Sequence, residues 1–245
     1  MESDQIREQE ILNSFTRINR WRTFLLISSY SSFVVYAYAG LTAFHLRNTI
    51  SNCLLGLETG DFQLLSRAAE ALTSDANDYD FSSILVVIVQ VLFFVAMLGW
   101  THSNAKAAKN LDSTQLSFST GWAIGAWFIP LFNFFRPREI IKESLNVVSK
   151  GYPKVLLNFW WGFFLLHILL SNFLARAQDK TISDMESLSP NSSLETIENH
   201  FYDLKVLVTG NLVCHWGVSI IPFVLLLILL RKTIPSVKNT AQPGA

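Results

Sequence analysis

Five stretches of the chain contain no Asp, Glu, Lys or Arg, and they set the architecture that we expect. The stretches are 23–46, 81–105, 113–135, 155–175 and 206–230. A membrane-spanning helix needs about 20 mostly apolar residues. Four of the stretches meet this requirement with continuous runs of Leu, Ile, Val and Phe. We therefore predict an all-α integral membrane bundle with four spanning helices, at about 23–46, 81–101, 155–175 and 206–230.

The third uncharged stretch differs from the others. Its apolar part covers only 121–135 and contains Gly121, Gly125 and Pro130, so it is too short and too broken for a straight span. We predict a re-entrant hairpin at 116–135. Non-helical backbone at membrane depth is tolerated only where protein or a water-filled cavity surrounds it, so we expect this hairpin to pack inside the bundle.

The composition agrees with a membrane protein. Of the 245 residues, 50% are hydrophobic and only 16% are charged, where soluble proteins average about 25% charged residues. The 19 Lys and Arg residues balance the 19 Asp and Glu residues, so the net charge indicates no nucleic-acid partner. The two cysteines, Cys53 and Cys214, form neither a disulfide scaffold nor a CxxC motif.

The distribution of basic residues predicts the topology, because Lys and Arg concentrate in segments that face the cytoplasm. If all five stretches crossed, the 19 basic residues would divide almost evenly between the two sides. If the third returns on its own side, fourteen of these 19 are cytoplasmic and twelve of the 19 acidic residues are outside. We predict a multi-pass protein of the inner (plasma) membrane with both termini cytoplasmic. It would comprise an N-terminal segment 1–22, a membrane domain 23–230 and a disordered tail 231–245.

A further helix is predicted between the hairpin and the third span. Residues 137–150 begin with Pro137, which suits a first helical turn. Their apolar side chains fall on one face of the helix, and their charged side chains fall on the rest. The apolar face consists of Ile140, Ile141, Ser144, Leu145 and Val148. We expect an amphipathic connector in the plane of the inner interface, and a helix that binds a partner is the alternative.

The two outer connections also contain helical signals. In the first, Asp61 precedes apolar residues at helical spacing, namely Phe62, Leu65, Ala69 and Leu72. In the second, the string Ser192-Ser193-Leu194-Glu195 matches a capping box. We therefore expect short outer helices in both connections.

The hairpin carries a specific motif. Trp127, Pro130, Asn133 and Pro137 follow the pattern W-x-x-P-x-x-N-x-x-x-P, and Glu143 comes after it. With these residues the chain resembles, over about 90–176, the uncharacterised bacterial multi-pass membrane family known as domain of unknown function 4328. Arg138 stands where that family often has an aromatic residue. The resemblance implies a bacterial multi-pass membrane protein and no assigned activity.

A first candidate site is a polar layer in the outer half of the spans. At about 1.5 Å per residue, Tyr36, Gln90, His167 and His215 lie about 12–15 Å below the outer surface. Asn211 shares one face of the last span with His215. The layer is either a ligand or cofactor pocket, with His167 and His215 ligating a haem iron or a metal, or interhelical hydrogen bonding. The second interpretation is favoured, and we expect no cofactor.

The second candidate site is the hairpin with its motif. It comprises Trp122, Trp127, Pro130, Asn133, Arg136, Pro137 and Glu143. A break in helical hydrogen bonding beside an amide is typical of the sites of pores and transporters. The alternative is that the aromatic residues anchor the hairpin at the interface and that Asn133 caps it. The two interpretations remain open.

Three functions remain open. The first is a ligand-binding or conducting module built on the hairpin, the second a structural protein that recruits partners, and the third a haem- or metal-binding bundle. An enzyme is not expected, because nucleophile elbows, phosphate loops and HExxH motifs are absent from the sequence. The spans contain no charged residue, which argues against a proton relay. We expect the lipid bilayer as a partner and no nucleic acid, and leave homo-oligomers and protein partners open.

Overall fold

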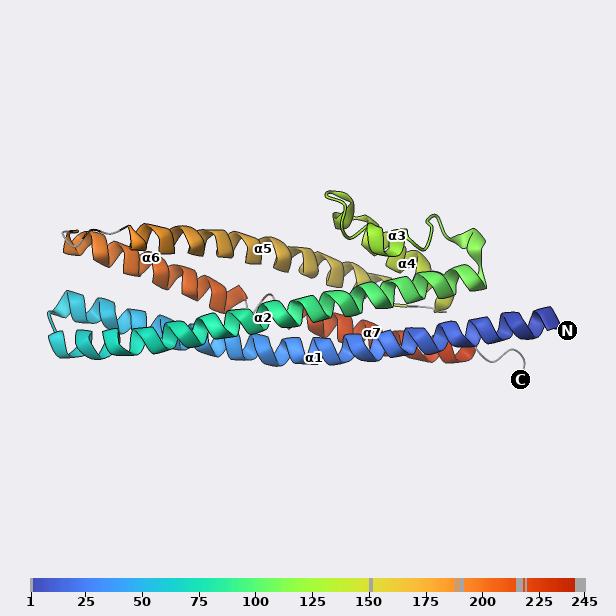
Figure 1. The fold of residues 1–245 in the computed structure, drawn as a ribbon, viewed down its shortest axis with the longest axis horizontal. Coiled ribbons are helices and arrows are strands. Elements are labelled where there is room, and N and C mark those ends of the chain that lie inside the picture. The colour runs from blue at the N-terminus through green and yellow to red at the C-terminus, as the bar shows by residue number, and fades with distance from the viewer. Residues whose placement is uncertain are drawn as a thin grey trace. The chain divides into compact units, whose positions relative to one another are not determined.

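The computed structural model consists of helices joined by short connections (Figure 1). It describes residues 2–149, 152–187, 189, 192–214, 218 and 220–240. The long helices are α1 (Glu2–Thr59), α2 (Phe62–Leu111), α4 (Arg136–Val148), α5 (Lys154–Glu186), α6 (Leu194–Val213) and α7 (Ile220–Thr240). The short elements are η1 (Ser113–Gln115), α3 (Trp122–Gly125) and η2 (Phe132–Phe134). Since the described residues contain no β-strand, the predicted all-α class is confirmed.

Three of the described helices are long and apolar enough to cross a membrane. They are Gln9–Thr59, Phe62–Leu111 and Lys154–Asp184. The spans predicted at 23–46, 81–101 and 155–175 lie within them. The span predicted at 206–230 includes residues 215–217 and 219, which lie outside the described residues. Helix α7 extends to Thr240, and the tail expected at 231–245 stays a prediction.

The chain divides into two units, which are described separately. The first comprises Met1–Ser32, Val89–Phe163 and Pro222–Ala245. The second comprises Phe33–Ile88 and Phe164–Ile221. Helices α1, α2, α5 and α7 each contribute residues to both units.

Helices α1 and α2 are much longer than the spans within them. The 58 residues of α1 correspond to about 87 Å of helix, whereas a bilayer's hydrocarbon core is about 30 Å thick. The separate short helix expected after Asp61 is therefore wrong in its extent, because it is the first part of α2. Charged residues end an apolar run without ending a helix, since Glu, Lys, Arg and Gln are good helix formers.

A two-residue turn joins α1 to α2 in the second unit. Gly60 adopts a φ of 67°, which glycine tolerates without a steric penalty. The Asp61 carboxylate then accepts hydrogen bonds from the backbone N–H groups of Gln63 and Leu64, each at 3.0 Å, and so caps α2. In the second outer connection Ser193 caps α6, with its Oγ accepting from the Thr196 N–H at 3.2 Å. The cap predicted from Ser192 to Glu195 is thus displaced by one residue.

The core of the second unit lies between α1, α2 and α6. Its fully buried members recur on α1 every three or four residues, as expected for one face of a helix. They are Ala43, Leu46, Ile50 and Leu54, which cluster with Tyr79 of α2 and Val208 of α6. Burial of this stripe gives α1 a packed face well beyond residue 46.

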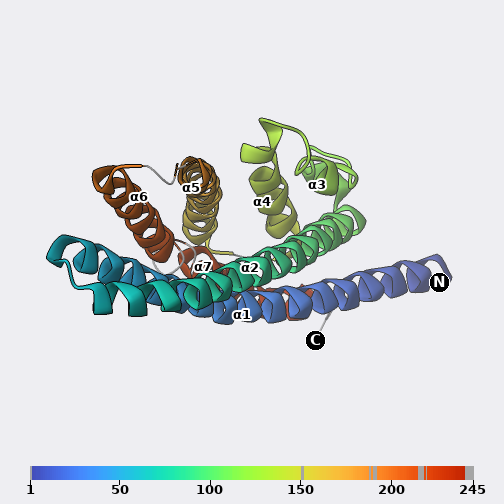
Figure 2. The same ribbon diagram turned by 60° about the vertical axis from the view of Figure 1, so that its left-hand side comes forward.

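In the first unit, α4 packs against α2 through the face that the sequence predicts. Ile140, Ile141, Ser144, Leu145 and Val148 are all buried. Ile140 clusters with Ala105 of α2 and with α3, while Val148 clusters with Ala107 and Ala108. Both views show α3 and α4 beside the C-terminal part of α2 (Figures 1 and 2). The apolar face of α4 is thus covered by protein.

The first unit also contains a close contact between α1 and α2. A Cβ atom added at Gly99 of α2 would lie 2.3 Å from ring atoms of Trp21 on α1. Glycine at this position therefore allows the Trp21 ring to lie directly on the α2 backbone.

Candidate functional site

The segment between α2 and α4 begins with a capped turn. The Asp112 carboxylate accepts hydrogen bonds from the Thr114 N–H at 3.0 Å and from the Thr114 Oγ1 and Gln115 Nε2 at 2.6 Å. These bonds favour the ionised carboxylate and lower the pKa of Asp112. The turn ends α2 and starts the irregular chain that follows.

An aromatic cluster holds the middle of this segment. Trp127 is buried, and its ring contacts Phe94 of α2 and Trp161 of α5, in both cases with ring centroids 5.7 Å apart and an edge-to-face geometry. The Trp161 Nε1 donates a 2.8 Å hydrogen bond to the Phe134 carbonyl. Two long helices thus fix the segment, at its middle through the Trp127 ring and near its end through the Phe134 carbonyl.

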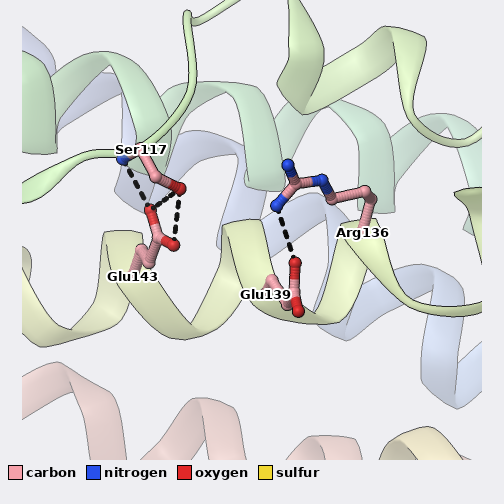
Figure 3. A network of polar contacts seen from close by, with 4 residues as sticks. All are labelled: Ser117, Arg136, Glu139 and Glu143. Atoms are coloured by element: carbon pink, nitrogen blue, oxygen red, sulfur yellow. Dashed lines mark hydrogen bonds and ion pairs between the residues drawn. The ribbon is translucent and has the colours of Figure 1, made fainter.

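Two polar contacts lie at α4, of which the first holds the start of the segment on the helix and the second lies within the helix (Figure 3). The Glu143 carboxylate accepts hydrogen bonds from the Ser117 N–H at 2.9 Å and from the Ser117 Oγ at 2.8 and 3.0 Å. Arg136 forms an ion pair with Glu139, with 2.8 Å between Nη1 and Oε2. Glu143, the last residue of the sequence motif, therefore positions the loop in front of α4.

A pocket of about 190 Å³ lies between this loop, α3, η2 and α4. Its lining combines one cation, two hydroxyls and four apolar side chains. The residues are Ser117, Phe118, Ser119, Trp122, Phe132, Arg136 and Ile140. Such a lining suits a small ligand with an anionic group and an apolar part. Loop residues 117–119 carry no periodic pattern, and sequence reasoning missed them.

The other residues of the predicted hairpin site take different positions. Trp122 and Arg136 line the pocket, whereas Trp127 lies in the aromatic cluster. Pro137 is in the first turn of α4, and Pro130 is exposed before Leu131, whose φ of 68° makes a tight turn. The Oδ1 atom of Asn133 is buried and has no hydrogen-bond partner among the residues that the structure describes.

The predicted polar layer separates into two networks, the first of which joins Tyr36 and His167. The Tyr36 hydroxyl lies 3.3 Å from the His167 Nε2, and the Ser171 Oγ lies 3.3 Å from its Nδ1. Ser171 also contacts the Cys214 Sγ at 3.7 Å. Both ring nitrogens of the buried His167 are thus engaged, and ligation of a haem iron would break one of these contacts. Among the described residues, no three His, Cys, Asp or Glu side chains are placed to hold a metal ion.

Asn211 belongs to the second network of the same unit. Its Nδ2 donates hydrogen bonds to the Tyr79 hydroxyl at 2.8 Å and to the Gln178 Oε1 at 2.9 Å. The Tyr79 hydroxyl donates to Gln178 at 3.2 Å. Gln90 belongs to the first unit, and His215 lies outside the described residues.

Sequence reasoning missed Ser171, Gln178 and Tyr79 as network members. A signal existed for the first two, since Ser171 and Gln178 follow His167 by four and eleven residues and so share its helix face. Tyr79 stands between two aspartates, where nothing marked it as buried.

Comparisons with known proteins bear on the whole arrangement. A family model described as a domain of unknown function (DUF4328) matches residues 64–210. The matched region includes the pocket, the aromatic cluster and both polar networks except Tyr36, Asn211 and Cys214. Searches of curated proteins and of solved structures gave no match. Because the match covers more than half of the chain and includes the tryptophan, proline and asparagine motif, the chain belongs to the DUF4328 family.

Proposed function

We propose that this protein is a multi-pass protein of the plasma membrane whose segment 112–137 binds a small anionic ligand at the cytoplasmic interface. Three helices that are long and apolar enough to span a membrane support the first part. The topology is completed by a fourth span at 206–230, the re-entrant course of 116–135 and two cytoplasmic termini. They rest on the asymmetry of the basic residues.

Single cysteines in the connections test this topology in intact cells. All four chosen positions are exposed. The proposed inner side is probed by Thr114→Cys and Lys142→Cys, and the proposed outer side by Gln63→Cys and Asn199→Cys. A membrane-impermeant maleimide should label the outer pair at once and the inner pair only after permeabilisation. The unmodified chain is the control, because Cys53 and Cys214 are both buried. Opposite accessibilities at Thr114 and Lys142 would exclude the re-entrant course.

The pocket carries the binding proposal. Arg136 brings a permanent positive charge, and its ion pair with Glu139 uses only one of the five donors of the guanidinium. Because both side chains of the pair are nearly half exposed, the pair is worth at most about 1 kcal/mol, and an entering anion can share or replace it. Trp122, Phe118 and Phe132 provide walls for the apolar part of the ligand.

Benzoate is a suitable probe, since it joins a carboxylate to one ring. We expect isothermal titration to detect benzoate binding, and Arg136→Gln to weaken it tenfold or more, as loss of a charge-assisted hydrogen bond predicts. Lys142→Gln is the matched control, because it removes the same charge from an exposed position of α4 outside the pocket. Benzyl alcohol should bind no better to the wild type than to Arg136→Gln. Equal benzoate affinity in wild type and Arg136→Gln would refute the proposal.

A further inference from the structure

The segment that lines the pocket is rich in exposed apolar side chains. Phe128, Leu131 and Phe135 are exposed by 64%, 75% and 71%, and Trp122 and Phe132, which line the pocket, are themselves more than 40% exposed. An exposed apolar surface of this density is typical of a site that meets lipid or another partner. The pocket lining and this surface therefore share residues.

Three basic side chains lie on the first turns of α4. Arg136 lines the pocket, and Arg138 and Lys142 follow it on the first turns of α4. Arg138 donates hydrogen bonds to the Asn158 Oδ1 at 2.6 and 3.2 Å, whereas Lys142 is exposed. Of the carboxylates nearby, Glu139 is paired with Arg136, and Glu143 accepts hydrogen bonds from Ser117. Basic residues next to an apolar membrane-facing surface attract anionic lipid headgroups.

From these two observations we infer that the natural ligand is an anionic phospholipid. Its phosphate would bind Arg136 and the hydroxyl of Ser119 in the pocket, and its acyl chains would lie over Phe128, Leu131 and Phe135. A guanidinium binds phosphate oxygens in a bidentate manner, and aromatic rings such as that of Trp122 are enriched at the headgroup level. This inference rests on the proposed binding function and names the class of its ligand.

Native mass spectrometry of the full chain in detergent tests the inference. The probes are dioleoyl phosphatidylglycerol, dioleoyl phosphatidylcholine and glycerol phosphate. Phosphatidylcholine has the acyl chains without the net negative charge, and glycerol phosphate has the charged phosphate without the acyl chains. We expect phosphatidylglycerol to bind at least tenfold more tightly than either other probe. Arg136→Gln should abolish this preference, whereas Lys109→Gln, which removes a charge from an exposed position of α2 outside the pocket, should keep it.

A second variant separates the lipid from a free phosphate compound. Phe128→Ser removes an exposed apolar side chain that does not line the pocket, so it should weaken phosphatidylglycerol binding severalfold and leave benzoate binding unchanged. If glycerol phosphate binds as tightly as phosphatidylglycerol, the ligand is a soluble organophosphate and the inference is overturned. The inference is also overturned if Phe128→Ser has no effect on lipid binding. If the wild-type protein failed to bind benzoate as well, the proposed function itself would be overturned.

Discussion

Replacing Trp127 by alanine is expected to lower the free energy of unfolding by about 3–5 kcal/mol, as found for large buried aromatic residues. The ring is buried between Phe94 and Trp161 and joins the segment 112–135 to α2 and α5. Its removal would leave a cavity that rigid helices cannot close. The loss should appear as a lower midpoint when the purified protein is unfolded by a rising mole fraction of SDS in mixed micelles.

Two variants make the Trp127 result specific. Phe128→Ala removes the adjacent ring, which is mostly exposed, and should change stability by less than about 1 kcal/mol. Trp127→Phe keeps one aromatic ring in the cluster and should recover much of the loss. If Trp127→Ala and Phe128→Ala had equal effects, the cluster would not be what fixes the segment.

Replacing Gly99 by alanine is the second substitution with a large expected effect. The new methyl group would overlap the Trp21 ring, at 2.3 Å from its Cδ2 and Cε3 atoms, so α1 and α2 would have to separate or the ring would have to leave its site. Overpacking of this kind costs about 1–3 kcal/mol. Thermal unfolding followed by circular dichroism should show the loss.

Gly162→Ala is the matched control for Gly99→Ala. Gly162 also lies within a long helix, but a Cβ atom there meets nothing within 4 Å. This substitution should be neutral or stabilise the protein by up to about 1 kcal/mol, since alanine is the better helix former. In the double variant Trp21→Leu with Gly99→Ala, the smaller side chain should recover part of the stability. Equal effects of the two glycine substitutions would contradict the close contact.

The helices were predictable where apolar periodicity alone determines them. The buried face of α4, from Ile140 to Val148, was predicted residue by residue, because an amphipathic pattern specifies a helix and its orientation together. The continuations of α1 and α2 beyond the spans were missed. Their charged surface resembles that of a loop, while their buried positions, such as Ile50 and Leu54, are too few to dominate the pattern.

The candidate site was only partly predictable from the sequence. Of the residues named from the sequence, Arg136 lines the pocket, Glu143 binds the Ser117 loop and Trp127 lies in the aromatic cluster. Ser117 and Ser119 could not be found, because small polar residues in an irregular loop are positioned by distant contacts and not by periodicity. The sequence also could not predict that Asn211 and His167 belong to different hydrogen-bond networks, since depth along a helix does not determine which neighbour a side chain contacts.

The contacts of Trp127 also set an order of assembly during synthesis. Its partner Phe94 precedes it in the chain and belongs to a helix that is completed first, whereas Trp161 is translated 34 residues later. Chains fold from the N-terminus as they emerge. The α1–α2 hairpin, closed by only Gly60 and Asp61, can therefore form early. The segment that forms the pocket gains its contacts with Trp161 only when α5 has been made, so its packing is completed late in the biogenesis of the protein.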